Sequence, residues 1–287
     1  MTIFSVHSAQ IEELLPQSRI VTFTTDFGLT DHYVGAMKGV ILNVNPTVQL
    51  VDISNSVQAY DVLDGAIAIS QAYRYFPAET IHLVIVDPGV GTSRRPLLVR
   101  TEKHFFLAPD NGVLSFVFEQ EKERLQVRHI TAEHYFLQPV SQTFHGRDIF
   151  AAIAGRLSKG LNSAAFGEEI TDYVHFAAPK PKVLGPNTIK GVVLKVDKFG
   201  NLITNIRPSD LPALFEEETP PFRIIIGKAE ISKMKTAYAQ GTPGETFAIL
   251  GSMGFLEIAT NRGNAARLVG ADKGSDVGLV LEGASVK

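Results

Sequence analysis

The chain has 287 residues, of which 45% are hydrophobic and 20% charged, a globular composition at a length for which two domains are the natural expectation. A formal charge of −3 and an isoelectric point near 6.2 give no reason to expect nucleic acid or an anionic membrane as a partner. The absence of cysteine excludes disulfides, thiolate metal sites and a cysteine nucleophile.

Residues 1–19 are interpreted as an N-terminal tail, because they have neither the basic region nor the apolar region of a secretory signal. The sequence contains no run of 18 apolar residues, so no membrane-spanning segment is expected. A chain without cysteine suits a reducing compartment, and we therefore expect a cytoplasmic protein.

Residues 20–176 alternate between strand-like and helix-like runs, which predicts an α/β domain with a largely parallel sheet. The run "IHLVIV" lacks alternation, as is typical of a strand covered on both faces, and "VQLVDIS" is also predicted to be buried. The expected elements are strands over 19–26, 48–54 and 81–86, helices over 33–44 and 61–76, an antiparallel pair over 96–102 and 103–109, and a helix over 146–160 that ends at a glycine.

Residues 177–188, "AAPKPKVLGPNT", carry three prolines without periodicity and are predicted to be a linker. Residues 189–287 contain short strand-like runs parted by turn residues, such as "KGVVLKVDKFGNLITNI" and "DVGLVLEG". This pattern of short strands and turns predicts an all-β C-terminal domain, either a small barrel or a sandwich.

Two acidic residues, Asp26 and Asp87, follow the ends of predicted strands, where ligands collect in open α/β sheets. Asp also favours helix caps and turns, so each alone has a structural explanation. His145 precedes a predicted helix, whose positive end would favour a neutral imidazole that can accept a proton, although a capping or packing role is common there. Arg94 and Arg95 follow Asp87 on a glycine-containing loop.

Several familiar motifs are missing from the sequence. It contains no G-x-G-x-x-G after a strand, no G-K-[ST] phosphate loop and no H-E-x-x-H. Asp26, Asp31 and His32 could coordinate a metal, but their spacing fits no defined site. The stretch "APDNGVLS" is interpreted as a tight turn into a helix. We therefore expect neither a metal nor a cofactor.

Six stretches taken together resemble the adenosine-forming S-adenosyl-L-methionine (SAM) hydrolases, the SAM hydroxide adenosyltransferases, which are related to SAM-dependent chlorinases and fluorinase. In chain order they are "TTDFGLTDHYVGAMKGV", "VDPGVGTSRRPL", "APDNGVLS", "FHGRDIF", "VDKFGNLITNI" and "GSMGFLEIATNRGNAA". The resemblance runs from Ile20 to the C-terminus and implies a Rossmann-like N-terminal domain and a C-terminal β-barrel. It also implies a homotrimer, with each active site between the N-terminal domain of one subunit and the C-terminal domain of its neighbour.

The resemblance implies a catalytic triad of Asp87, Arg94 and His145, which the halogenating relatives lack. The implied reaction is displacement at ribose C5′ of SAM, with methionine leaving as a neutral thioether, so the enzyme has to position and deprotonate a water. Asp87 and His145 can accept hydrogen bonds or the proton, and Arg94 can orient Asp87. The resemblance does not assign the proton acceptor to one member, since these groups would titrate together.

The resemblance also implies substrate contacts in both domains. Asp26 would accept bonds from the ribose hydroxyls, Asp197 would meet the methionine ammonium, and Asn201 would read the adenine edge. The other implied contacts are Ser252 for the carboxylate, Glu257 close by, and Asn261 with Arg262 near the adenine. Met253 stands where the fluorinase has an arginine, so the carboxylate must be anchored differently. A hairpin turn at "FGN" is an alternative explanation for the presence of Asn201. Glu257 and Arg262 can also be structural or surface charges.

Three other interpretations remain. A SAM-dependent halogenase shares the fold, but the retained triad argues against it. A non-catalytic SAM or adenosine sensor would bind through Asp26 and Asn201 without needing to activate water. A metal-dependent hydrolase would be sensitive to chelators.

Overall fold

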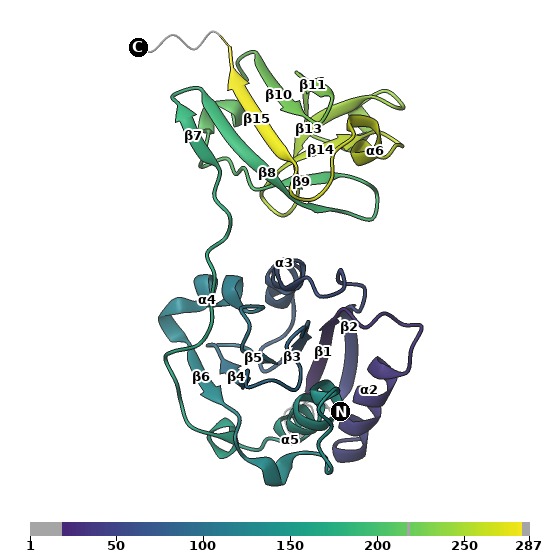
Figure 1. Cartoon of the computed structure of the whole chain (residues 1–287), viewed down its shortest axis with the longest axis vertical. Helices are drawn as coiled ribbons and strands as arrows, with labels where there is room; N and C mark the ends of the chain where they lie inside the picture. Colours follow the sequence, from purple (N-terminus) through teal and green to yellow (C-terminus); the bar gives the residue numbers. More distant parts are fainter. Residues whose placement is uncertain (1–18, 217–218, 283–287) are drawn as a thin grey trace, which may run out of the picture. The chain divides into compact units, whose positions relative to one another are not determined.

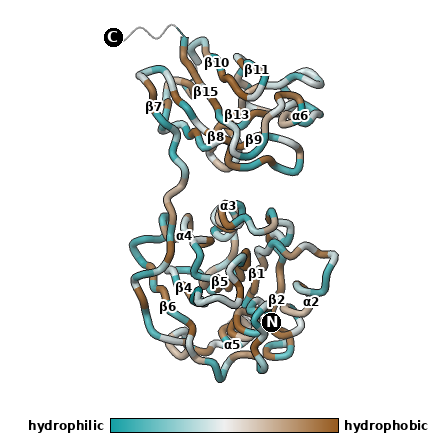
Figure 2. The backbone as a smooth tube through the Cα atoms, in the orientation of Figure 1, coloured by the Kyte–Doolittle hydropathy of each residue, from teal (hydrophilic) through white to brown (hydrophobic). Residues whose placement is uncertain are grey.

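The computed structural model describes residues 19–216 and 219–282, and the chain divides into two compact units between Ala177 and Ala178 (Figure 1). The predicted tail lies outside the described residues, apart from Arg19. Each unit has its own apolar core, and hydrophobic residues follow its central strands (Figure 2).

The first unit is built on a six-stranded sheet with the order β2-β1-β3-β5-β4-β6. The pairs β1–β2, β1–β3 and β3–β5 are parallel, whereas β4 is antiparallel to both β5 and β6, as expected for the pair after residue 96. The strands are β1 (Ile20–Thr25), β2 (Gln49–Ser54), β3 (Ile81–Ile85), β4 (Pro96–Arg100), β5 (Phe105–Pro109) and β6 (Gln126–His129). The N-terminal unit is therefore a mixed α/β structure.

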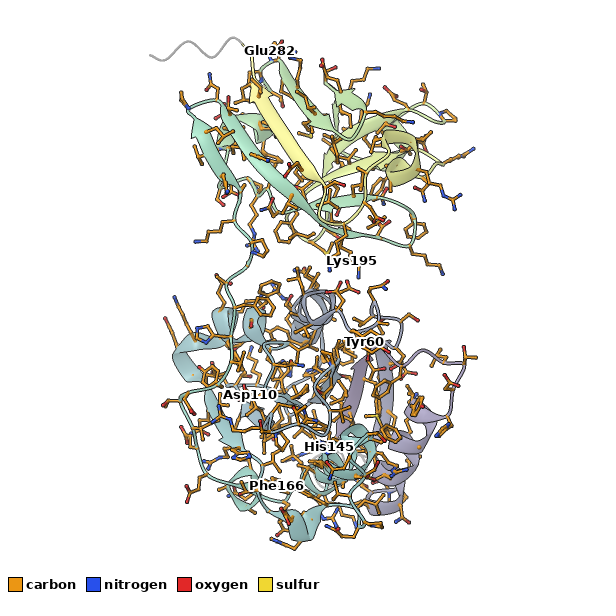
Figure 3. The ribbon with its side chains drawn as sticks, in the orientation of Figure 1. Tyr60, Asp110, His145, Phe166, Lys195 and Glu282 are labelled. Atoms are coloured by element: carbon orange, nitrogen blue, oxygen red, sulfur yellow. The ribbon has the colours of Figure 1, made fainter. Side chains whose placement is uncertain are left out.

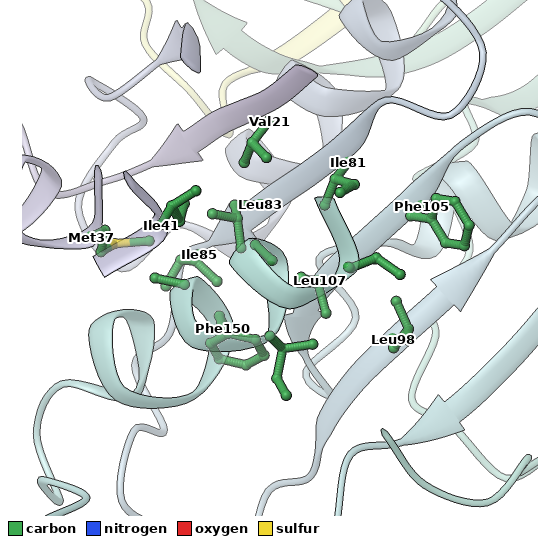
Figure 4. Close-up of a cluster of buried hydrophobic side chains, with 14 of the residues drawn as sticks. Val21, Met37, Ile41, Ile81, Leu83, Ile85, Leu98, Phe105, Leu107 and Phe150 are labelled. Atoms are coloured by element: carbon green, nitrogen blue, oxygen red, sulfur yellow. The ribbon is translucent and has the colours of Figure 1, made fainter. Parts of the chain in front are cut away.

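Among the described residues, four α-helices accompany this sheet: α2 (Tyr33–Val44), α3 (Val62–Ala72), α4 (Ser115–Glu121) and α5 (Ala152–Ser158). Successive residues of β3 point to opposite faces: Leu83 belongs to the core with α2 and α5, and Val84 to the core with α3 and α4. Figure 4 shows part of the first core, in which Met37 and Phe150 pack among strand residues. All five residues of β3 are buried, which confirms the expectation of a strand covered on both faces.

Two expectations for this unit need correction. Strand β2 was predicted to be buried, but it pairs only with β1 at the sheet edge, and none of its residues is fully buried. An apolar run alone does not distinguish a central strand from an edge strand. The helix expected over residues 146–160 consists of a π-helical segment (Gly146–Ala151) followed by α5, and Gly160 adopts the positive φ of +90° expected of a helix stop.

The second unit is a curled sheet of nine strands that forms a half-barrel. The strand order is β11-β10-β15-β8-β9-β14-β13-β12, with β7 paired to β8. The elements are β7 (Lys182–Gly185), β8 (Thr188–Val196), β9 (Leu202–Thr204), β10 (Phe222–Ile226), β11 (Ala229–Ile231), β12 (Met234–Lys235), β13 (Thr246–Leu250), β14 (Leu256–Thr260), α6 (Ala265–Val269) and β15 (Asp276–Leu281). The all-β prediction is confirmed, apart from the short α6.

The segment 177–188, predicted to be a linker, contains β7, which forms an antiparallel pair with β8. Its prolines at positions 179, 181 and 186 flank the strand instead of interrupting it, so the composition that indicates a linker is compatible with a short edge strand. Within the described residues, no helix combines the length and the apolar character that crossing a membrane requires.

Candidate active site

Parallel strands bring two of the predicted site residues to one edge of the first sheet. Strands β1 and β3 are neighbours in register, with Thr25 opposite Ile85. Asp26 directly follows β1, and Asp87 comes two residues after β3. Because the carboxyl ends of parallel strands meet at the same sheet edge, the two carboxylates approach each other. The negative charge of Asp87 contributes to raising the pKa of Asp26, after the larger effect of burial.

The loop from Asp87 to Arg94 turns tightly and packs against the segment before His145. Gly91 has a φ of +79°, and a Cβ on it would lie 2.2 Å from the backbone oxygen of Gln142. Only glycine accommodates both the left-handed backbone and this close approach. The loop is thereby held against residues 142–145, which places Arg94 beside His145.

Asp87, Arg94 and His145 form one buried hydrogen-bonded set. The Nε of Arg94 donates to Oδ1 of Asp87 at 3.0 Å, and its Nη2 donates to Oδ2. The same Nη2 lies 2.8 Å from Nδ1 of His145. The exposed fractions are only 8% for the Arg94 side chain, 5% for that of Asp87 and 9% for His145. The structure thus brings together the three residues of the predicted triad.

The surroundings favour a neutral imidazole at His145. Burial lowers its pKa from the usual 6.5, and the positive charge of Arg94 lowers it further, against the opposing effects of Asp87 and Asp148. His145 directly precedes the π-helical segment, and its side chain makes no capping hydrogen bond there. Arg94 in turn lies over the ring of Phe150, with 5.6 Å between Cζ and the ring centroid. Its Nη1 is buried without a hydrogen-bond partner.

The second arginine of the pair has a structural role. Arg95 forms ion pairs with Asp110 and Asp172 at 2.7 and 2.8 Å. Asn111, in the stretch predicted to be a turn, donates from Nδ2 to the backbone oxygen of Val86 at 2.8 Å and so fastens the end of β3 beside Asp87. The sequence predicts only a tight turn into a helix for this stretch.

Tyr60 was not singled out from the sequence, yet it holds Asp26. Its backbone N–H donates to Oδ2 of Asp26 at 2.8 Å. Tyr60 is one of the non-glycine residues with a positive φ, +65°, which is unusual for an aromatic residue. Strained backbone of this kind persists where surrounding structure enforces it, often at functional sites. Figure 3 labels Tyr60 and His145 in the first unit and Lys195 in the second.

The second unit contains a pocket of about 880 Å³ that collects most of the substrate contacts expected in that part of the chain. This volume lies within the range of small-molecule sites. Predicted residues that line it are Asp197, Asn201, Ser252, Met253, Glu257 and Arg262; those not predicted are Lys195, Phe199, Ile203, Tyr238, Thr260 and Gly263. Asn261 does not line the pocket, and its side chain donates from Nδ2 to the backbone oxygen of Gly241 at 2.6 Å.

Asp197 and Asn201 are joined in one turn between β8 and β9. The Oδ1 of Asp197 accepts from the backbone N–H groups of Phe199 and Asn201, and its Oδ2 accepts from Nδ2 of Asn201 at 2.8 Å. These bonds agree with the turn interpretation of Asn201. Both residues also line the pocket, and the binding role of Asn201 stays a prediction.

Glu257, on β14, is a buried carboxyl group in this pocket. The hydroxyl of Tyr238 donates to its Oε2 at 3.0 Å. Burial raises the pKa of Glu257, and the charge of Asp197 adds to this effect, whereas the bond from Tyr238 opposes it. Burial and the nearby Glu257 raise the pKa of Tyr238 to about 12. A Cβ on Gly251 would lie 1.7 Å from Oε1 of Glu257, so the glycine leaves room for the carboxyl.

The weak metal signal at Asp26, Asp31 and His32 gains no support. Across residues 19–216 and 219–282, no three His, Cys, Asp or Glu side chains are arranged to hold a metal ion. Asp31 and His32 are exposed, and the His32 ring packs 4.6 Å from that of Tyr33.

Comparison with known proteins identifies the family. Residues 21–167 match the SAM hydroxide adenosyltransferase N-terminal domain, and residues 191–278 match the C-terminal domain of the same family. The chain belongs to the SAM hydroxide adenosyltransferase family, which confirms the resemblance seen in its motifs.

Similar proteins include two named (R)-S-adenosyl-L-methionine hydrolase. The one from Methanocaldococcus jannaschii is 31% identical over 91% of this chain and 95% of its own length, and the one from Salinispora tropica is 34% identical over 88% and 95%. A fluorinase from Actinoplanes is more distant, at 27% identity over 84% and 91%. A crystal structure of an uncharacterised conserved protein from Thermotoga maritima superposes with a TM-score of 0.83 at 35% identity, over 91% of this chain and 99% of that one.

Proposed function

We propose that this protein is an enzyme that hydrolyses SAM to adenosine and L-methionine by attack of water on ribose C5′. The relatives named SAM hydrolases support the substrate and the reaction. The choice of water as the nucleophile rests on the contact of Arg94 with both Asp87 and His145. A buried carboxylate and a buried imidazole that are held by a guanidinium are groups suited to activating a water molecule.

The chemistry of SAM sets a limited task for these residues. Methionine leaves as a neutral thioether, so no general acid is needed at the leaving group. A nucleophile that carries negative charge and a sulfonium neutralise each other as the new bond forms, and a site with little water favours that step. General-base assistance contributes about 10²–10⁴-fold to such reactions.

The substrate contacts follow the same proposal. Asp26, held by Tyr60, would accept hydrogen bonds from the ribose hydroxyls. In the second unit, Asp197 would bind the methionine ammonium and Asn201 the adenine edge. The remaining contacts are Ser252 and the backbone at Met253 for the carboxylate, Glu257 near them, and Asn261 with Arg262 beside the adenine.

The names of the relatives specify the R form of SAM, and we propose that this chain also prefers that epimer. Since the two epimers differ at the sulfonium sulfur, a sample containing both provides an internal comparison. Incubation with the purified protein should consume the R epimer first, as followed by chromatography. Equal consumption of both epimers would remove the stereochemical part of the proposal and leave the hydrolysis standing.

A SAM-dependent halogenase is the second candidate, because fluorinases are among the relatives. The two are separated by incubating the protein with SAM, with and without chloride, in water labelled with heavy oxygen. A hydrolase places the label in the 5′-hydroxyl of adenosine under both conditions. A halogenated 5′-deoxyadenosine as the main product would favour the halogenase, and tight binding without any product would favour a sensor.

The proposal includes a Rossmann-like N-terminal domain, a cytoplasmic location and turnover without a metal or cofactor, so activity should survive chelators. It also includes a homotrimer whose active sites combine the N-terminal domain of one subunit with the C-terminal domain of its neighbour. Subunits of Asp87→Ala and Asn201→Ala, each poorly active alone, should regain activity after exchange. Hetero-oligomers that form without recovered activity would show that each site is built within one chain.

A further inference from the structure

The hydrogen bonds around Arg94 restrict where protons can reside in the triad. A guanidinium only donates hydrogen bonds and stays protonated in proteins. Its Nη2 carries two protons, of which one points to Oδ2 of Asp87 and leaves the other for Nδ1 of His145, at 2.8 Å. The Nδ1 of His145 must therefore be the unprotonated nitrogen, with its lone pair already used.

This contact fixes the tautomer of His145. A neutral imidazole has one protonated and one unprotonated nitrogen, so Nε2 carries the proton when Nδ1 accepts from Arg94. The charged groups acting on this ring are Arg94 and Asp87 from the loop after β3, and Asp148 from its own helix. Burial and Arg94 together keep the ring neutral by lowering its pKa. His145 then has no free lone pair with which to take a proton.

We infer that Arg94 holds His145 as a hydrogen-bond donor through Nε2–H, which leaves the carboxylate of Asp87 as the member of the triad that takes the proton from the attacking water. Each oxygen of Asp87 accepts one bond from Arg94 and has a further lone pair. Arg94 is a positioning residue in this arrangement, since it acts through both neighbours. The inference rests on the proposed hydrolysis of SAM and assigns the roles within that reaction.

The step balances with these groups alone. The water oxygen forms a bond to C5′, the bond from C5′ to sulfur breaks, and its electron pair stays on sulfur as the thioether. One water proton moves to Asp87 and from there to solvent, while the other stays in the 5′-hydroxyl of adenosine. The proton on Nε2 of His145 is never transferred and can donate to the water oxygen throughout.

The first test is spectroscopic and needs no substrate. Nitrogen-15 spectra of the imidazole groups distinguish protonated from unprotonated nitrogens, and the signals of His145 among the eight histidines are those lost in His145→Gln. We expect a protonated Nε2 and an unprotonated Nδ1 at neutral pH. A protonated Nδ1, or a ring protonated at both nitrogens, would overturn the inference whether or not the protein hydrolyses SAM.

The second test distinguishes hydrogen-bond donation by His145 from general-base catalysis by His145. Glutamine can accept from Arg94 through its oxygen and donate through its amide, but it cannot take a proton. His145→Gln should therefore keep kcat within about tenfold of the parent, whereas loss of a general base removes about 10²–10⁴-fold. His145→Leu, which neither accepts nor donates, should be clearly slower than His145→Gln. Equal, large losses in both variants would assign the proton transfer to His145.

The pH profile completes the assignment. If His145 takes no proton, the dependence of kcat on pH should keep its shape in His145→Gln. Asp87→Asn should lose about 10²–10⁴-fold at every pH, since an amide cannot accept the proton. Disappearance of the acidic limb in His145→Gln would identify His145 as the titrating base and overturn the inference.

Discussion

The guanidinium of Arg94 meets the carboxylate of Asp87 side-on, with Nε 3.0 Å from Oδ1 and Nη2 bonded to Oδ2, and both side chains are more than nine-tenths buried. Such a planar, two-point contact fixes the orientation of the carboxylate as well as its charge. A lysine at position 94 keeps the charge but offers a single ammonium group in place of the fork.

Arg94→Lys should therefore lower kcat by at least about tenfold, equivalent to about 1.4 kcal/mol of activation free energy. The Michaelis constant for SAM should change much less, because the proposed substrate contacts lie elsewhere. Steady-state kinetics with SAM measure both quantities. A near-normal kcat with a steeply raised KM would make Arg94 a binding residue and reduce the catalytic set to Asp87 and His145.

Tyr238→Phe removes the hydroxyl that donates to the buried Glu257 at 3.0 Å. Since that bond lowers the pKa of Glu257, its loss should raise this pKa further, and leave a buried acceptor unpaired at a cost of about 1–3 kcal/mol of folding stability. We expect a reduced free energy of unfolding in urea and a raised KM for SAM. Tyr75→Phe, at an exposed site, is the control and should match the parent.

Gly251→Ala places a Cβ where Oε1 of Glu257 now lies, at a distance of 1.7 Å. The carboxyl must move, so KM should rise, and the stability should fall by about 1–3 kcal/mol, the usual range for overpacking. Gly185→Ala is a matched control in the same unit, because no atom lies within 4 Å of its added Cβ. Unchanged kinetics in Gly251→Ala would show that Glu257 does not take part in substrate binding.

Because His82 is buried, we expect the protein to lose folding stability in acid. It is fully buried on β3, its Nδ1 lies 2.7 Å from Oγ1 of Thr22, and its Nε2 has no partner. Burial lowers its pKa from 6.5 to about 3, so the unfolded chain binds a proton in this window and the folded protein does not. The contribution of His82 to the free energy of unfolding therefore falls as the pH drops from 6.5 towards 3, by at most about 1.4 kcal/mol per pH unit.

The measurement is urea unfolding at a series of pH values for the parent and for His82→Gln, which cannot titrate. The variant should be less sensitive to acid than the parent. His134→Gln, at an exposed position, should keep the parental pH dependence. An identical pH slope in the parent and His82→Gln would place the acid sensitivity in other groups.

Local patterns predicted most of the elements, because strand and helix periodicities depend on near neighbours in the chain. The carboxylates at the ends of β1 and β3 were also visible in the sequence, since strand ends are where ligands collect. Contacts across long stretches of chain were not visible. Tyr60 reaches Asp26 over 34 residues and Tyr238 reaches Glu257 over 19, and neither tyrosine stands in a recognisable motif.

The incorrect predictions also arise from contacts between distant parts of the chain. The edge position of β2 depends on which strands pair in the folded sheet, and β7 depends on its partner β8 and not on its own proline-rich composition. The role of Asn261 beside the adenine stays a prediction, and the contact of its amide with Gly241, twenty residues earlier, could not be predicted from the motif either. A motif locates a segment, but the direction of each side chain is decided by the tertiary contacts around it.

The sharing of one guanidinium between an acid and an imidazole has an evolutionary consequence. Replacing Asp87 alone would leave the Arg94 cation buried and unpaired, a change that destabilises proteins by about 3–5 kcal/mol, and replacing Arg94 alone would leave the carboxylate in the same state. A lineage that exchanged water for another nucleophile by losing these two residues one at a time would pass through less stable intermediates. The two charged positions, 87 and 94, should therefore be inherited or lost together, and a library designed to change the nucleophile has to vary them jointly.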